Sequence, residues 1–126
     1  MLSTHGPRFG LDREQALRVG GAFGAGMART GETCGAVTGG LMVIGLKHAK
    51  VRPDDDDSRE LAYALAQEFM DIFQERNGSL LCKTLLGADV STPEGMAAVR
   101  KGNLFATICP RYVKSASEIL EGLLRE

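Results

Sequence analysis

The segment from Thr33 to Lys47 is apolar, rich in glycine and almost free of charge, and it limits the folds open to the chain. Its length favours a helix over a strand. Each glycine inside a helix costs roughly 1 kcal/mol relative to alanine. Small residues recur in it at i,i+4 spacing, so one flank of this helix lacks side chains. We therefore expect a buried central helix against which a neighbouring backbone packs closely. Its glycines are Gly35, Gly39, Gly40 and Gly45.

The residues before and after this segment carry signals for further helices. Residues 1–10 show no periodicity and are expected to form an irregular lead-in. Asp12 is a candidate N-cap, with Gln15 as its partner in a capping box, for a helix that ends near Gly24. After an acidic loop, Asp57 or Ser58 can start the most amphipathic helix of the chain, which Asn77-Gly78 ends. Its apolar positions are Leu61, Leu65, Phe69, Ile72 and Phe73.

The C-terminal third of the chain continues in the same way. Ser79 is expected to start a short helix that ends at Gly87. Ser91 or Thr92 caps the next helix, which has Pro93 in its first turn and ends at Gly102. Residues 103–109 form a helical turn, and Pro110 opens a last helix. The apolar stripe of that helix consists of Val113, Ala116, Ile119, Leu120, Leu123 and Leu124.

These patterns predict an all-α fold. No segment alternates between polar and apolar residues over a useful length, and no internal repeat is visible. At 126 residues the chain is most simply one domain that can bury a core without disulfide bonds. We expect a compact bundle of five to six helices around the glycine-rich central helix, with residues 1–126 in a single helical domain.

Charge and composition exclude several classes of function. The net charge of −1 gives no electrostatic reason to expect a nucleic acid or an anionic membrane as a partner. There is no apolar run of about 18 residues, and the first residues lack the features of a signal peptide. Three cysteines are too few and too widely spaced for a secreted disulfide framework, so a reducing compartment is indicated. We expect a cytoplasmic protein.

The three cysteines, Cys34, Cys82 and Cys109, each fall where a helix is predicted to begin. Free N–H groups and the positive end of the helix dipole favour the thiolate there, so these thiols are expected to lose their protons easily. A thiolate is the form that reacts with disulfides and binds metals. The alternative is that each is a small buried apolar residue without reactivity. The sequence leaves both interpretations open.

Other candidate sites are weaker. The run from Asp54 to Asp57 lacks the alternating ligands, the central glycine and the terminal glutamate of a calcium loop. The segment GAFGAGMARTGE has the glycine content of a phosphate-binding loop, without its G-K-[ST] ending or a preceding strand. His5 and His48 stand alone, and no Ser-His-Asp arrangement is recognisable.

The stretch FGAGMARTGETCGAVTGGLMVIGLK resembles the signature of C_GCAxxG_C_C, a family of small bacterial and archaeal redox-active proteins. Cys34, Gly35, Ala36 and Gly39 form its C-G-A-x-x-G arrangement. The segments around Cys82 and Cys109 resemble the two downstream cysteine segments of the family. The resemblance covers the chain from about Phe9 onward. It implies a site made by the three cysteines, framed by the glycines and the alanine of the arrangement.

The family pattern has a fourth cysteine, on a helical segment upstream of the equivalent of Gly10, and this chain has none there. One hypothesis is a redox site in which Cys34, Cys82 and Cys109 cycle between thiol and disulfide, with an unknown redox partner, or hold an iron–sulfur cluster or other metal. Water, a residue of a partner or His5 would then complete the set of ligands. The other is a helical interaction or assembly module with a degenerate cysteine site, and a homodimer fits either.

Overall fold

The computed structural model describes residues 1–49 and 51–125. The expected all-α fold is confirmed: the described residues form helices and contain no strand. None of their helices combines the length and the apolar character that a membrane span requires. The elements are α1 (Leu2–His5), the 3₁₀ helix η1 (Gly6–Phe9), α2 (Arg13–Val19), α3 (Gly24–Met27), α4 (Gly35–His48), α5 (Asp56–Asn77), α6 (Cys82–Leu86), α7 (Pro93–Lys101), α8 (Leu104–Thr107) and α9 (Cys109–Leu123).

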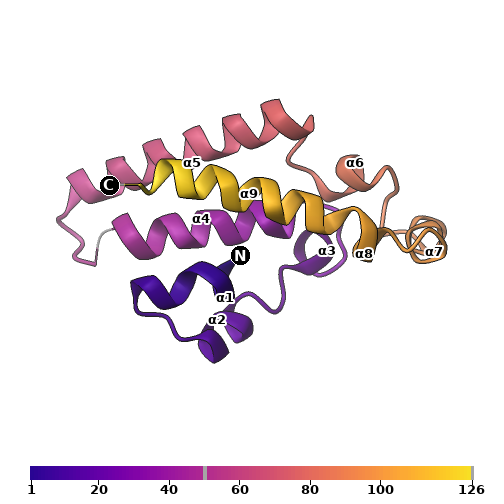
Figure 1. The fold of residues 1–126 in the computed structure, drawn as a ribbon, viewed down its shortest axis with the longest axis horizontal. Coiled ribbons are helices and arrows are strands. Elements are labelled where there is room, and N and C mark those ends of the chain that lie inside the picture. The colour runs from indigo at the N-terminus through magenta and orange to yellow at the C-terminus, as the bar shows by residue number, and fades with distance from the viewer. Residues whose placement is uncertain (50, 126) are drawn as a thin grey trace.

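Helices α4, α5 and α9 lie side by side and form the main layer of the molecule (Figure 1). Each of the three contacts the other two. α1 and α2 pack beneath α4, while α6, α7 and α8 lie beyond the N-terminal end of α4. The side chains buried completely in this layer come from all three helices, and the largest are Phe69, Phe73, Ile44 and Leu120.

The glycine-rich helix α4 lies at the centre, as its sequence predicts, and two of its glycines allow close packing. The ring of Phe69 from α5 occupies the space that a Cβ on Gly40 would need. A Cβ on Gly39 would lie 2.7 Å from Cβ of Met1, far closer than carbon atoms approach without a clash. Gly45 has no atom within 4 Å of its Cβ position, so the structure gives no packing reason for that glycine.

Several expected boundaries were wrong. α5 begins at Asp56 after the N-cap Asp55, before the expected Asp57 or Ser58. Residues 1–10 are not an irregular lead-in, because α1 and η1 cover most of them. These helices are too short to show a periodic pattern, and they form because Leu2 and His5 are buried in the molecule. α2 ends at Val19, before the expected Gly24. α6 begins at Cys82, because the hydroxyl of Ser79 accepts a hydrogen bond from the nearby N–H of Leu81 and caps no helix.

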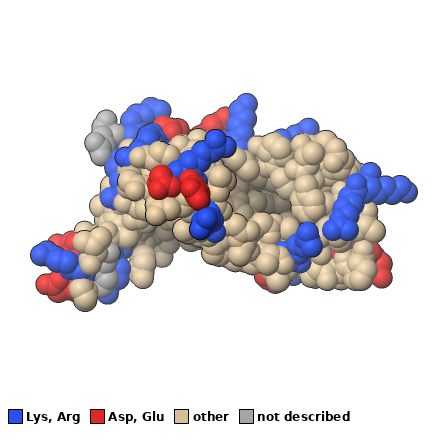
Figure 2. Space-filling model, turned by 90° about the horizontal axis from the view of Figure 1, so that it is seen from below, with Lys and Arg blue, Asp and Glu red and all other residues tan. Residues whose placement is uncertain are grey.

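The segment from Ala25 to Arg29 forms a left-handed turn. All five of its residues have positive φ, between 52° and 68°. Left-handed backbone costs roughly 1–2 kcal/mol for each residue other than glycine, so the surrounding structure must hold this turn in place. Viewed from the side of α1, α2 and α3, the molecule has a hollow with largely uncharged walls (Figure 2).

Candidate thiol site

Two of the cysteine segments are joined by a short antiparallel contact. Thr33 and Leu81 form an isolated β-bridge. The N–H of Cys34 donates to the carbonyl of Leu80 at 2.8 Å, and the N–H of Cys82 donates to the carbonyl of Glu32 at 2.7 Å. Cys34 and Cys82 therefore each follow the bridge by one residue, and both side chains leave it on the face opposite to Thr33 and Leu81. They are diagonal neighbours across the contact.

Cys34 is the N-cap residue of α4 and is half-buried. Its thiol makes no capping hydrogen bond, and the N–H of Val37 donates to the carbonyl of Cys34 at 2.9 Å. The backbone N–H groups of Ala36 and Val37, in the first turn of the helix, nevertheless lower the pKa of the thiol, as expected at a helix start. Burial has the larger effect, however, and the pKa of Cys34 is raised.

Cys82 is the first residue of α6 and is only 6% exposed. It belongs to an apolar cluster with Leu86, Val90 and Val99. The left-handed turn lies against it, since a Cβ on Gly26 would be 2.6 Å from Cβ of Cys82. Burial, with smaller contributions from the charges on Cys34, Cys109 and Asp89, raises the pKa of Cys82 to about 11.

Cys109 is the first residue of α9, is half-buried and packs against the same apolar cluster as Cys82. Burial raises its pKa, and the charge on Cys34 adds to the effect. Tyr112 follows one helical turn later and donates a hydrogen bond from its hydroxyl to the carbonyl of Leu85 at 2.8 Å. This bond ties α9 to α6 and so holds Cys109 near Cys82.

The three thiols therefore influence one another. The charge on Cys34 raises the pKa of both Cys82 and Cys109, and no other cysteine contributes to the shift of Cys34 itself. Two backbone N–H groups oppose the effect of burial on the pKa of Cys34, one does so for Cys109, and none does so for Cys82. The expectation that all three thiols lose their protons easily was wrong, because burial at each position outweighs the helix start.

In the described part of the chain, the three thiols are not arranged as a ligand set for a metal ion. Within residues 1–49 and 51–125, no three His, Cys, Asp or Glu side chains are placed so that they could hold a metal ion. The three cysteines are also free thiols, with no disulfide among them. The thiols are thus related by the effects of their charges on one another, and Cys82 and Cys109 also share one apolar cluster.

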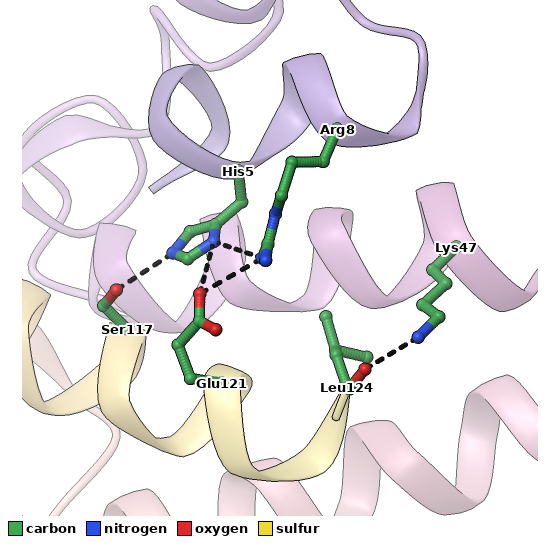
Figure 3. Close-up of polar contacts among 6 residues, drawn as sticks. All are labelled: His5, Arg8, Lys47, Ser117, Glu121 and Leu124. Carbon is green, nitrogen blue, oxygen red and sulfur yellow. Dashed lines mark hydrogen bonds and ion pairs between the residues drawn. The ribbon is translucent and has the colours of Figure 1, made fainter. Parts of the chain in front are cut away.

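His5 lies outside the cysteine site, which removes it as a ligand there. Its imidazole is 3% exposed and is enclosed by α9 and η1 (Figure 3). The guanidinium of Arg8 donates to Nδ1 at 2.8 Å, and Nε2 lies 2.9 Å from Oγ of Ser117. Both ring nitrogens are therefore occupied by contacts within the protein. Glu121 lies 3.4 Å from Nδ1 and also pairs with Arg8.

The residues expected to frame the site have different surroundings. Gly35 follows Cys34, and a Cβ there would lie 3.2 Å from the carbonyl oxygen of Phe23. Ala36 lies in the first turn of α4, where its backbone N–H lowers the pKa of Cys34. Gly39 faces Met1 rather than a cysteine.

Sequence reasoning missed two residues that shape the site, Gly26 and Tyr112. Gly26 lay in a segment interpreted as a glycine-rich loop, and nothing in its local pattern indicates contact with Cys82. Tyr112 follows Cys109 at i+3, the spacing of neighbours on one helix face, which is a signal that could have found it.

Comparisons with known proteins identify the family to which the chain is related. Residues 1–123 match a family model described as "Putative redox-active protein (C_GCAxxG_C_C)". Searches of the curated proteins and of the solved structures returned no match. The family model covers nearly all of the chain and includes all three cysteine segments that the fold brings together. The chain belongs to the C_GCAxxG_C_C family.

Proposed function

We propose that the protein exchanges thiols with disulfides, using Cys34 as the attacking thiol and Cys82 as the resolving thiol. The observation that carries this proposal is the bridge between Thr33 and Leu81, which directs both cysteine side chains to one face. Membership of a family described as redox-active supports it.

The order of events follows from the electrostatics of the site. We assign the first step to Cys34, whose thiolate is favoured by two backbone N–H groups. This thiolate attacks one sulfur of a disulfide substrate, forming a mixed disulfide and releasing one thiol. The charge on Cys34 disappears in that step.

The second step uses Cys82. Because the charge on Cys34 raises the pKa of Cys82, the loss of this charge makes Cys82 easier to deprotonate. Cys82 then attacks the sulfur of Cys34, which forms the Cys34–Cys82 disulfide and releases the second thiol. One substrate disulfide and two protein thiols give one protein disulfide and two released thiols.

The second step needs a small local movement. Diagonal neighbours across an antiparallel pair have Cα atoms about 7–8 Å apart. A disulfide usually requires Cα atoms within about 7 Å. α6 has five residues and is held at its start by two backbone hydrogen bonds to residues 31 and 32, so this short helix is the element that shifts.

The test is oxidation of the reduced protein by 2-hydroxyethyl disulfide, followed by peptide mapping. We expect a Cys34–Cys82 disulfide with Cys109 free. Cys34→Ser should abolish the reaction, Cys82→Ser should trap the mixed disulfide on Cys34, and Cys109→Ser serves as the matched control that still oxidises. A chain that stays fully reduced would overturn the proposed function. A disulfide that includes Cys109 would overturn the assignment of Cys82.

A further inference from the structure

A cavity of about 370 Å³ opens beside the cysteine site. It is lined by Gly21, Ala22, Gly24, Ala25, Ala28, Arg29 and Phe105. Its lining is mostly glycine and alanine, with one cation and one aromatic ring as the exceptions. The size and lining suit a small ligand rather than a protein chain.

The cavity wall is backed by the cysteine segments. Ala25 lines the cavity and packs against the apolar cluster that contains Cys82. Gly24, also in the wall, has its Cα 4.0 Å from the position of a Cβ on Gly35, the residue after Cys34. Phe105 belongs to α8, the helix before α9, and Cys109 at the start of α9 packs against the same apolar cluster as Ala25. A ligand in this cavity would lie next to all three thiol-bearing segments.

Arg29 gives the cavity its charge. Its side chain is exposed, and no carboxylate of the described residues forms an ion pair with its guanidinium. An unpaired guanidinium at the edge of a small apolar cavity favours a ligand that carries a carboxylate.

We propose that this cavity binds small disulfides that carry carboxylates, with Arg29 pairing with a carboxylate and Phe105 packing against the carbon chain. The proposal rests on the thiol–disulfide exchange proposed above and names its class of substrate. No cysteine lines the cavity itself, and the turn of Ala25 to Arg29, whose Gly26 packs against Cys82, separates the bound substrate from that thiol.

The test compares three disulfides of similar size: dianionic 3,3′-dithiodipropionate, neutral 2-hydroxyethyl disulfide and dicationic cystamine. The quantity measured is the ratio of the oxidation rate with dithiodipropionate to the rate with hydroxyethyl disulfide. Arg29→Gln should lower this ratio about fivefold to tenfold, as expected for the loss of one charge-assisted contact. It should raise the relative rate with cystamine. Arg13→Gln, an exposed arginine of α2 outside the cavity, is the matched control and should leave the ratio unchanged.

A second measurement separates binding from reaction. Suberate has the same carboxylates and chain length as dithiodipropionate but carbon in place of the two sulfurs, so it can bind without reacting. We expect suberate to shift the backbone NMR signals of Arg29 and Phe105 and to slow oxidation by dithiodipropionate. If all three disulfides oxidise the protein with unchanged ratios in Arg29→Gln, the cavity proposal is wrong and the exchange activity stands. If suberate binds but no disulfide reacts, the exchange activity is wrong and the anion-binding cavity stands.

Discussion

At the scale of single residues, Cys34 shows how two opposing effects decide the state of a thiol. The backbone N–H groups of Ala36 and Val37 at the helix start favour its thiolate, and burial favours its protonated form. The sequence indicates the first effect, because it depends on a local helix start. It does not indicate the second, because burial results from contacts with segments far away in the chain. The positions of the cysteines could be predicted, and their ionisation could not.

The raised pKa values predict how the thiols respond to pH. Because burial raises the pKa of Cys34 above its ordinary value, the thiolate fraction is small at neutral pH and grows as the pH rises. The rate of alkylation of Cys34 by iodoacetamide should therefore increase about tenfold for each pH unit between pH 7 and pH 9. Mass spectrometry of the labelled peptides measures this rate. A rate that is already constant above pH 7 would mean that the thiol is ionised at neutral pH.

Gly26 is the second residue whose role depends on tertiary contact. A Cβ at this position would lie 2.6 Å from Cβ of Cys82 and 2.7 Å from the backbone nitrogen of Glu32, and the backbone has φ of +68°. Gly26→Ala should lower the free energy of unfolding by about 2–4 kcal/mol, since it adds a clash to the left-handed strain.

Gly87→Ala is the matched control, because Gly87 has a similar φ of +72° and no atom within 4 Å of its Cβ position. Its loss should be limited to the backbone strain, about 1–2 kcal/mol. Urea denaturation of both variants gives the comparison. Equal losses would show that the space beside Cys82 is not limiting.

At the scale of the elements, local signals located most helices and misplaced several ends. Asp12 accepts a hydrogen bond from the N–H of Gln15 at 2.8 Å, and Thr92 accepts one from the N–H of Gly95 at 3.0 Å, as their capping patterns predict. Ser79 has an equally suitable side chain, and yet α6 starts at Cys82. The bridge between Thr33 and Leu81 keeps residues 80 and 81 extended, and no local pattern encodes such a contact.

The glycines of α4 provide a prediction for a single helix. Gly40→Ala should lower the free energy of unfolding by about 1–3 kcal/mol, because its Cβ would displace the fully buried ring of Phe69. Gly45→Ala should raise it by up to about 1 kcal/mol, because alanine favours the helix and the Cβ position is empty. Urea denaturation measures both changes. Effects of the same sign in the two variants would show that helix propensity, rather than contact with α5, governs this helix.

At the scale of the whole molecule, the sequence predicts the layer of α4, α5 and α9 but not how the N-terminal helices close over it. The apolar stripes of the long helices contain Phe69, Phe73, Ile119 and Leu120, all of which are buried. The attachment of α1 and η1 combines apolar packing of Leu2 in the core with polar contacts to α9, which His5 makes from α1 and Arg8 from η1 (Figure 3). Because His5 and Ser117 are 112 positions apart, no sequence pattern connects them.

This polar attachment predicts a dependence of stability on pH. Burial lowers the pKa of His5, the charge on Arg8 lowers it further, and Glu121 opposes both. The folded state therefore binds a proton less readily than the unfolded state, whose histidine titrates near pH 6.5. The contribution of His5 is present in full above about pH 6.5 and is lost as the pH falls below that value, because the unfolded state then takes up the proton.

The physical reason for this loss lies in the hydrogen bonds of the ring. Nδ1 accepts from the guanidinium of Arg8, so a proton on Nδ1 would set two donors against each other and break this contact between η1 and the rest of the cluster. Urea denaturation between pH 5 and pH 7.5 should show that the free energy of unfolding falls with decreasing pH more steeply in the native chain than in His5→Gln. One group contributes at most about 1.4 kcal/mol per pH unit to this difference.

His48→Gln, which removes the other histidine, is the control and should keep the steeper dependence of the native chain. Parallel curves for the native chain and His5→Gln would show that proton uptake by His5 is not coupled to folding, and that α1 and η1 are held to α9 by apolar packing alone.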